Sequence, residues 1–280
     1  MTDTLVLRLD GRPVGRYVYR SALATDHAPR PYLHPVTTLG GTAVTELMPD
    51  DHPHHLGVGV AVPDVEGRNF WGGRTFVRDR GSVALDNHGA QRHQGFPMRE
   101  PDAFVEDLYW TAGGTRLLHE RRTLVARELA GQAWALDFTF ALGNTTDAPL
   151  SIGSPATNGR PGAAYGGFFW RAPKEKEPPA VFTAHTEGET AVHESTADWV
   201  AFAGDGWTLV FAGADEATRR DPWFVRAAEY PGVGSSLAHA RRTAIEAGAT
   251  LTRRIVTVVA DGRLDRGQAA DLVRQAVRDE

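Results

Sequence analysis

Apolar and polar residues alternate along several stretches of this chain, and that alternation limits the folds it can adopt. The clearest stretch places large apolar side chains at every second position: Trp134, Leu136, Phe138, Phe140 and Leu142. Successive side chains of a β-strand point to opposite faces of a sheet, so this stretch predicts a strand with one face in the core. Similar patterns predict strands at residues 5–9, 117–125, 207–211 and 251–259.

Glycine and proline divide these stretches into short pieces. The 280 residues include 30 glycines and 17 prolines, a share above the roughly 12% that is usual in proteins. Turn signals flank the predicted strands at residues 10–11, 112–114, 204–206 and 247–248. We therefore predict an all-β fold, a large antiparallel β-sandwich that residues 1–280 form as a single domain. Residues 172–179 are expected to form an exposed loop rather than a linker.

Only the C-terminal residues show a helical pattern. Asp265 is placed to cap a helix, with Gln268 three residues later. An apolar stripe with helical spacing follows, made of Ala269, Leu272, Val273 and Ala276. We expect this short helix to cover an edge or a face of a sheet.

Charge and composition argue against several classes of function. The formal net charge of −5 does not favour binding to nucleic acid or to an acidic membrane. The chain has no cysteine, which excludes disulfides and cysteine nucleophiles. No apolar run approaches the ~20 residues of a membrane helix, and the first ten residues lack the basic and apolar regions of a secretion signal. We expect a soluble, cytoplasmic protein, and the sequence leaves its oligomeric state open.

Histidine is distributed unevenly along the chain. Eight of the eleven histidines fall between His27 and His119, and residues 50–57 read DDHPHHLG. Imidazole exchanges protons near neutral pH and binds metal ions. If this segment is extended, His52 and His54 share one face and His55 points to the other. A metal site would then need distant ligands, for which the candidates are His34, His88, His93 and Glu120. We predict neither a metal nor a cofactor.

A second candidate segment combines aromatic residues with paired glycines. Residues 158–160 (NGR) and 165–171 (YGGFFWR) contain Arg160, Tyr165 and Phe169. Glycine lets a backbone approach a ligand closely, and aromatic rings stack on the apolar face of a sugar. A strand with a glycine bulge accounts for the same residues, with Phe168 and Trp170 in the core and Phe169 on the other face. The sequence alone supports both interpretations.

The third candidate segment is residues 221–232, DPWFVRAAEYPG. It contains Trp223, Arg226 and Glu229, which would all reach one pocket if the segment lines it. Arg226 and Glu229 would alternatively form a surface ion pair of little energetic value. No phosphate-binding glycine loop, nucleophile elbow or HExxH motif is present.

Four segments resemble a widespread family of bacterial proteins that is often labelled "methane oxygenase PmoA". They are residues 31–36 (PYLHPV), 51–57 (DHPHHLG), 69–71 (NFW) and 165–171 (YGGFFWR). The resemblance runs over most of the chain, and the histidine segment is its most specific part. The methane monooxygenase subunit itself is an integral membrane protein, and this chain has no membrane span in its sequence. We therefore carry over no methane or copper chemistry.

The chain also shows a weaker similarity to the galactose mutarotase-like β-sandwich proteins. Those enzymes open and reclose aldose rings with a histidine acid and a glutamate base and need no cofactor. Residues 88–89 (HG) and 93–96 (HQGF) are similar to the histidine loop of that family. Residues 229–232 (EYPG), followed by residues 246–248 (EAG), resemble its glutamate strand and last strand. Spacing and flanking residues differ, so the similarity implies the supersandwich fold more than the reaction.

These segments favour a carbohydrate-active enzyme that acts on a sugar by histidine and carboxylate acid–base chemistry, as an epimerase, lyase or hydrolase. The candidate catalytic residues are His54, His55, His93 and Glu229. The candidate substrate-binding residues are His34, His52, Trp71, Arg160, Tyr165, Phe169, Trp223 and Arg226. In this scheme His54 or His55 is the acid, and Glu229 or His93 is the base.

Two other functions compete with the enzyme. A non-catalytic sugar-binding module would show a shallow aromatic platform of Trp71, Phe169 and Trp223, with scattered histidines. A metal-dependent hydrolase or lyase would use His52 and His54 with a remote glutamate or histidine.

Overall fold

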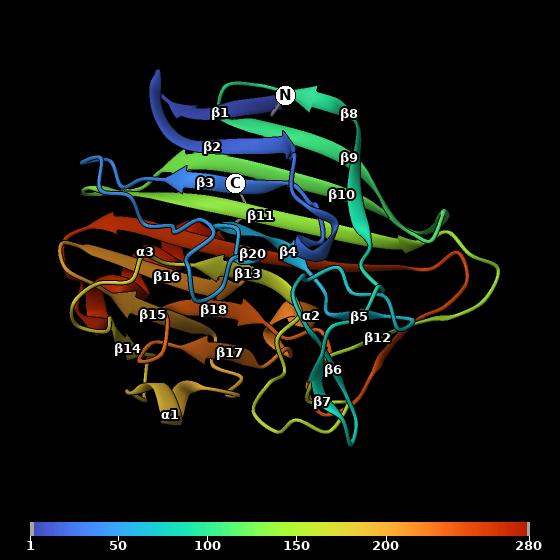
Figure 1. The fold of residues 1–280 in the computed structure, drawn as a ribbon. Helices are drawn as coiled ribbons and strands as arrows, with labels where there is room; N and C mark the ends of the chain where they lie inside the picture. Colours follow the sequence, from blue (N-terminus) through green and yellow to red (C-terminus); the bar gives the residue numbers. More distant parts are fainter. Residues whose placement is uncertain (1–2, 279–280) are drawn as a thin grey trace.

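The strands of the protein form two large antiparallel sheets, seen in a computed structural model that describes residues 3–278 (Figure 1). In order, the seven-stranded sheet contains β1 (Asp3–Leu9), β2 (Arg12–Arg20), β3 (Tyr32–Val36), β4 (Val58–Ala61), β13 (Gly167–Arg171), β18 (Gly232–Ser235) and β17 (Trp223–Arg226). The eight-stranded sheet contains β14 (Ala180–Phe182), β15 (Trp199–Ala203), β16 (Trp207–Gly213), β20 (Thr250–Asp261), β11 (Ala133–Asn144), β10 (Thr115–Glu128), β9 (Ala103–Ala112) and β8 (Ala90–Arg99). The predicted fold class, an all-β antiparallel sandwich, is confirmed.

Two smaller sheets and three short helical elements complete the fold. The three-stranded sheet contains β19 (Thr243–Ile245), β12 (Leu150–Gly153) and β5 (Asp64–Val65), and the hairpin contains β6 (Thr75–Val77) and β7 (Gly81–Val83). The short elements are η1 (Thr25–His27), α1 (Glu189–Val192) and α2 (Glu216–Arg219). Helix was predicted only at the C-terminus, and that prediction was wrong because it missed these three single turns. They are too short to show an apolar period.

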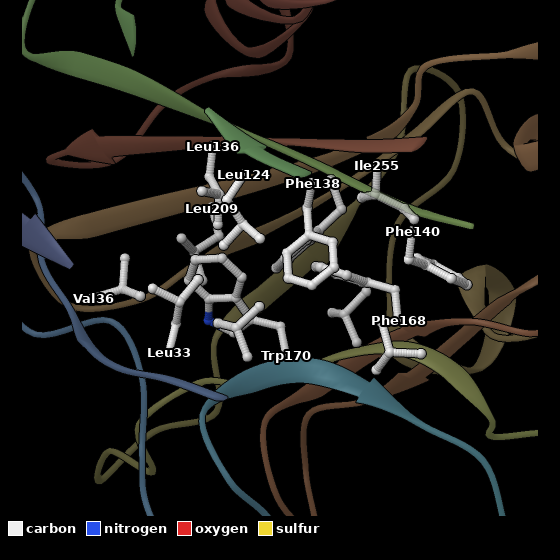
Figure 2. Close-up of a cluster of buried hydrophobic side chains, with 14 of the residues drawn as sticks. Leu33, Val36, Leu124, Leu136, Phe138, Phe140, Phe168, Trp170, Leu209 and Ile255 are labelled. Atoms are coloured by element: carbon white, nitrogen blue, oxygen red, sulfur yellow. The ribbon is translucent and has the colours of Figure 1, made fainter. Parts of the chain in front are cut away.

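The hydrophobic core lies between the two large sheets, and Figure 2 shows side chains from both of them meeting there. Strand β11 contributes Leu136, Phe138 and Phe140, which confirms the face predicted from the alternation. Strand β13 contributes Phe168 and Trp170 from the opposite sheet. The Trp170 indole Nε1–H donates to the Val44 carbonyl at 2.8 Å, so its polar atom is satisfied inside the core.

The alternation along β13 places consecutive aromatic residues on opposite faces of the seven-stranded sheet. Phe168 and Trp170 belong to the core, whereas Phe169 packs with Ala61, Trp71, Phe224 and Tyr230 in a separate cluster. The strand is buried on both faces. The seven-stranded sheet therefore carries a second, aromatic layer on the face that is turned away from the core.

The C-terminal helix α3 (Arg266–Val277) covers the outer face of the eight-stranded sheet. Its predicted capping box is present: the Asp265 carboxylate accepts from the Gln268 N–H at 2.9 Å, and the Gln268 side chain accepts from the Asp265 N–H at 2.9 Å. Ala269, Leu272 and Ala276 pack on apolar side chains of β16 and β20. The helix therefore covers the opposite side of the molecule from the aromatic layer.

Several local predictions are also confirmed. Asp10 and Gly11 have φ of 46° and 81° and join β1 to β2, as a type I′ hairpin requires. Residues 172–179 form no regular structure, and β14 begins directly after them. Among residues 3–278, no helix is long and apolar enough to cross a membrane.

Candidate functional site

The histidine segment forms a turn rather than an extended strand. The His52 N–H donates to the Pro49 carbonyl, and the His55 N–H donates to the His52 carbonyl, both at 2.9 Å. The expectation that His55 points away from His52 and His54 was therefore wrong, because the turn removes the alternation. Ring centroids lie 4.5 Å apart for His52 and His55, 4.9 Å for His54 and His55, and 5.9 Å for His52 and His54.

A buried arginine holds this turn in place. Arg30 donates through Nη2 to the His54 carbonyl at 2.6 Å, and through Nη1 to the carbonyls of His27 and Ala28 at 2.9 and 3.0 Å. Its guanidinium is buried, and all three acceptors are neutral carbonyls. Arg30 therefore fixes the position of His54 and leaves a positive charge beneath it.

A second turn brings an indole ring to the histidines. The Asn69 Oδ1 atom accepts from the N–H groups of Trp71 and Gly72 at 2.8 and 2.9 Å, which is the geometry of an Asx turn. The Trp71 ring then lies edge-on to His55, with centroids 5.8 Å apart. Gly72 has φ of 101°, and a Cβ atom there would lie 2.8 Å from the His27 carbonyl oxygen and 2.9 Å from the Cβ of His54.

We predict that Gly72→Ala destabilises the protein more than Gly81→Ala. Both glycines have positive φ, which costs an L-residue about 1–2 kcal/mol. A Cβ at Gly81 meets nothing within 4 Å, whereas a Cβ at Gly72 meets backbone. The clash adds about 1–3 kcal/mol. Chemical denaturation of the two variants measures the difference, and equal losses would show that the contact with His27 and His54 is unimportant.

The aromatic layer of the seven-stranded sheet packs against the histidine turn. The rings of Phe169 and Tyr230 lie 5.0 and 5.2 Å from the ring of His55. Tyr230 also lies 4.5 Å from His52. The Arg171 guanidinium lies 4.9 Å from the centre of the Tyr230 ring and donates to Glu46 at 2.8 and 2.9 Å. The histidine turn is thus packed directly on β13 and on the residues that follow β17.

These walls enclose a cavity of about 260 Å³. Eight of its lining residues were predicted from the sequence: His52, His54, His55, Trp71, Arg160, Tyr165, Arg226 and Glu229. A ninth predicted residue, Phe169, lies behind the cavity in contact with His55 and Trp71. The remaining lining residues were not predicted: Asp51, Gly72, Arg74, Ser82, Ala163, Phe224 and Tyr230.

The structure places three predicted site residues elsewhere. The His34 Nδ1 atom lies 3.0 Å from the Thr45 hydroxyl, and His34 does not line the cavity. His93 lies on β8, where its Nδ1 atom is 2.6 Å from a Glu106 carboxylate oxygen. Trp223 donates its indole N–H to the Ala197 carbonyl at 2.7 Å, and its ring belongs to the core. The next residue along β17, Phe224, points to the cavity in its place.

Burial controls the protonation of the histidines. It lowers the pKa of His54 to about 3, and the positive charge of Arg30 acts in the same direction. Burial, followed by the neighbouring His54 and His52, lowers the pKa of His55 well below its usual value. Both rings are therefore neutral near pH 7. A neutral ring cannot act as an imidazolium acid, so this direction argues against the predicted acid role of His54 or His55 in the free protein, and the lowered pKa also makes each ring a weaker base.

Two further groups shape the chemistry of the cavity. The His55 Nδ1 atom is buried without a hydrogen-bond partner among residues 3–278. An unpaired polar atom in a buried site carries a free-energy cost, which a bound ligand removes when it supplies the missing hydrogen bond. Burial raises the pKa of Tyr230, so its hydroxyl stays protonated and can donate. Glu229 lies exposed at the rim.

Metal binding receives no support from the geometry. Within the described part of the chain, no group of three or more histidine, aspartate and glutamate side chains is arranged to hold a metal ion. Of the distant ligands considered from the sequence, His88 lies near the turn, with its Nε2 atom 2.7 Å from the Gly73 carbonyl and an electrostatic effect on His54. The other candidates have partners elsewhere. Glu120, for example, accepts from Arg122 at 2.7 Å and from the Trp110 indole at 2.8 Å in a buried network.

A larger cavity, of about 810 Å³, lies elsewhere. Its walls come from β14, the start of α3 and the apolar residues Ala227 and Ala228. No histidine or tyrosine lines it. The smaller cavity is the better candidate site because titratable and aromatic side chains from several elements converge there.

Comparison with known proteins identifies the family. The model described as "Family of unknown function (DUF6807)" matches residues 4–274. The chain belongs to this family. A search of curated proteins found no match to this chain. The matching family description does not mention methane oxygenase. The resemblance to the family with that label therefore stays a prediction.

Two solved structures are similar to this DUF6807 chain at low identity. One is a heparan sulfate lyase HepC mutant from Pedobacter heparinus, with 12% identity, a TM-score of 0.43, and coverage of 94% of this chain and 35% of the other. The second is an alpha-galactosidase from Lactobacillus brevis, with 9% identity, a TM-score of 0.43, and coverage of 93% and 40%. The chain thus spans well under half the length of either protein.

Proposed function

We propose that the protein is a carbohydrate-active enzyme and that the cavity beside His52, His54 and His55 is its active site. The observation that carries the proposal is the convergence of three imidazole rings on a single small cavity, two of them, His52 and His55, with a buried nitrogen that has no hydrogen-bond partner in the described part of the chain. Perturbed titratable groups in a cleft are typical of catalytic sites.

The size and walls of the cavity favour a sugar. Its volume of about 260 Å³ lies below the range of pockets that hold drug-sized ligands, which is roughly 300–1,000 Å³. One sugar ring is a ligand of suitable size. Trp71, Tyr165 and Tyr230 offer ring surfaces to its C–H groups, and the histidines and Glu229 offer partners for its hydroxyls.

Each polar group has a role in this proposal. The unpaired Nδ1 atom of neutral His55 accepts a proton from the substrate, and this transfer requires that the charge of the bound substrate raises the low pKa of the ring. Tyr230, held protonated by burial, donates a hydrogen bond to the substrate oxygen that gains negative charge. Glu229 binds a sugar hydroxyl at the rim. Epimerisation, elimination and hydrolysis all include such a proton transfer, and the proposal covers these three reaction types.

The binding-module alternative fits the geometry less well. It predicts a shallow aromatic platform with scattered histidines, but Trp71 and Phe169 are only 4% and 6% exposed. Trp223 belongs to the core, and the three histidines converge. The aromatic rings therefore form walls of a cavity rather than an open surface. This arrangement supports a catalytic site over a binding platform.

Incubation with sugars and sugar acids in D₂O tests the proposal. The protein is expected to accelerate exchange of a carbon-bound proton, anomer interconversion or bond cleavage, followed by proton NMR. His55→Gln is expected to slow the reaction by about 10²- to 10⁴-fold. His185→Gln, at an exposed position outside the cavity, is the control and is expected to react at the wild-type rate. Equal rates for the wild type and His55→Gln would exclude His55 as the base.

A further inference from the structure

The arginines that line the cavity lack carboxylate partners. Arg226 donates to the carbonyls of Val225 and Gly162 at 2.8 and 2.6 Å, and Arg74 donates to the Ser82 carbonyl at 2.8 and 3.0 Å. Burial raises the pKa of Tyr165, and the charge of Arg160, which lies beside its side chain, acts in the opposite direction. None of the three forms an ion pair with a residue in the described range 3–278. Neutral partners leave the positive charge of each guanidinium uncompensated.

Arg226 is half-buried, whereas Arg74 and Arg160 are exposed. Three other arginines of the protein are paired with carboxylates. Arg242 pairs with Asp64 at 2.6 Å, Arg253 with Asp221 at 2.7 Å, and Arg254 with Asp137 at 2.7 Å. Each of these guanidiniums meets a carboxylate from a neighbouring strand or loop. The cavity thus brings together three guanidiniums that have no carboxylate partner within residues 3–278, and Arg30 adds a further buried positive charge beneath His54.

Arg160 and Arg226 lie on the same wall of the cavity. The bond from Arg226 Nη2 to Gly162 holds its guanidinium against the loop that carries Arg160. Arg226 also lies over the Phe224 ring, 4.7 Å from its centre, and the Tyr165 ring lies 5.5 Å from Phe224. The two guanidiniums therefore lie beside one pair of aromatic rings in the wall of the cavity.

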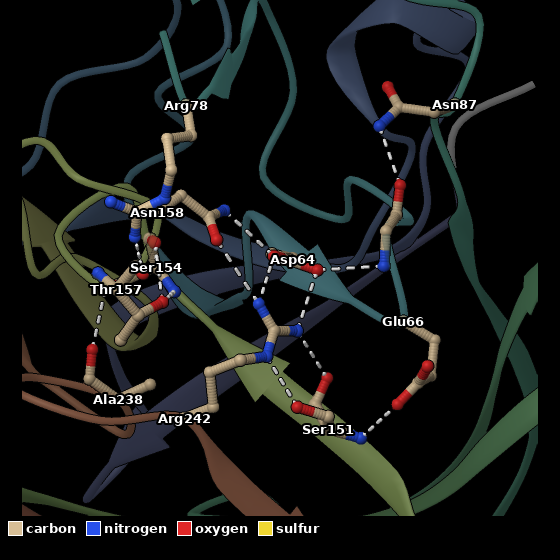
Figure 3. A network of polar contacts seen from close by, with 11 residues as sticks. Asp64, Glu66, Arg78, Asn87, Ser151, Ser154, Thr157, Asn158, Ala238 and Arg242 are labelled. Atoms are coloured by element: carbon tan, nitrogen blue, oxygen red, sulfur yellow. Dashed lines mark hydrogen bonds and ion pairs between the residues drawn. The ribbon is translucent and has the colours of Figure 1, made fainter.

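The loop that carries Arg160 is anchored by the polar network of Figure 3. Asn158 donates to Asp64 at 3.0 Å, and Ser154 donates to the Ala238 carbonyl at 2.7 Å. Arg242 donates to the same Asp64 carboxylate. Preorganised groups lose less conformational entropy when they bind a ligand. Arg160 thus extends from a loop that is fixed on its N-terminal side.

The acidic residues of the cavity do not neutralise these arginines. Asp51 lies 3.4 Å from His52, 3.7 Å from Arg171 and 4.0 Å from Lys174, so its charge is already shared with other groups. Glu229 is the other lining carboxylate, and it is exposed at the rim. The cavity therefore keeps an excess of positive charge when its histidines are neutral.

We propose that the substrate is an acidic sugar, and that Arg160 and Arg226 bind its carboxylate while the sugar ring extends toward His55. This inference rests on the proposed function, because it assumes that the cavity binds a sugar. A guanidinium presents paired N–H donors that match the two oxygens of a carboxylate. A hexuronic acid combines such a carboxylate with a ring of the size that the cavity holds.

Calorimetric titration with D-glucuronate, D-galacturonate, their uncharged methyl esters, and the neutral sugars glucose and galactose tests the inference. At least one uronate is expected to bind about tenfold or more tightly than its own ester, since hydrogen bonds to charged groups are the stronger ones. Added NaCl is expected to weaken binding of the acid and to leave binding of the ester unchanged.

Variants assign the preference to named residues. Arg226→Gln and Arg160→Gln are each expected to remove most of the tenfold preference, and Arg226→Lys, which keeps the charge, is expected to retain part of it. Arg78→Gln is the matched control, since Arg78 donates to the Thr157 carbonyl of the same loop but does not line the cavity. Melting temperatures verify that each variant is folded.

The outcomes separate this inference from the proposed function. Equal affinity for acid and ester, or binding of the neutral sugars alone, would overturn the acidic-substrate inference and leave a sugar site in place. A preference that survives in both glutamine variants, or that Arg78→Gln also abolishes, would overturn the assignment to Arg160 and Arg226. Absence of binding by every acid, ester and neutral sugar would overturn both proposals.

Discussion

Replacement of Arg122 by methionine is expected to lower the free energy of unfolding by about 3–5 kcal/mol. Arg122 is fully buried, and it donates to Glu120 at 2.7 and 3.0 Å, to Gln91 at 3.0 Å and to the Tyr17 hydroxyl at 3.0 Å. Tyr17 in turn donates to Glu106. Without the guanidinium, two buried carboxylates lose the cation that compensates them.

The neighbouring residue provides a matched control for this prediction. Arg121 points to the opposite face of β10, where it is exposed and pairs with Asp107 at 2.9 Å. Exposed ion pairs are screened by solvent, so Arg121→Met is expected to lose only a small fraction of the stability that Arg122→Met loses. Urea denaturation measures both variants. Similar losses would contradict a structural role for the buried network.

Phe168→Ala is expected to lower the free energy of unfolding by about 3–5 kcal/mol, because it opens a cavity between the two sheets. Its ring lies 5.5 Å from Phe138 of the opposite sheet and is 1% exposed. The folded fraction of this variant is expected to bind sugar with wild-type affinity, because Phe168 points away from the candidate site.

The same substitution at the next residue tests the other face of β13. Phe169→Ala removes a ring that lies 5.0 Å from His55 and 4.9 Å from Trp71. It is expected to weaken sugar binding as well as stability, since two walls of the cavity lose their support. Calorimetric titration at a temperature where both variants are folded compares them. A larger loss of affinity in Phe168→Ala would contradict the assignment of the two faces.

The main features of the fold could be predicted from local patterns. The alternation along residues 134–142 identified β11 and its buried face, and Asp265 with Gln268 identified the start of α3. The short strands β5 and β12 were not predicted, since their pairing joins Val65 to Ile152 across a long stretch of sequence. Strand order depends on such non-local contacts, which residue periodicity does not report.

The candidate site could be predicted in its composition but not in its geometry. The histidine run was evident, yet the turn that stacks His52 on His55 depends on hydrogen bonds to Pro49 and His52 carbonyls. Phe224 rather than Trp223 faces the cavity because the register of β17 decides which neighbour points outward. Tyr230 was not selected, although it directly follows Glu229 in the sequence.

The surroundings of His93 could not be predicted from the sequence either. Its neighbour Glu106 lies on β9, and the pairing of β8 with β9 places the two side chains together in a buried network. Nothing in the local sequence around His93 reveals that partner. A histidine selected for possible catalysis is therefore part of the interior of the sandwich, at a distance from the cavity that contains His54 and His55.

The central claim is that the cavity beside the histidine turn binds a sugar, and a thermal-shift titration tests it most directly. A ligand that binds only the native state raises the melting temperature. Sugars and sugar acids are titrated against the wild type, His55→Ala and the exposed control His185→Ala. We predict a ligand-dependent rise in the wild type and in His185→Ala that is absent in folded His55→Ala. A rise of equal size in His55→Ala would contradict the claim.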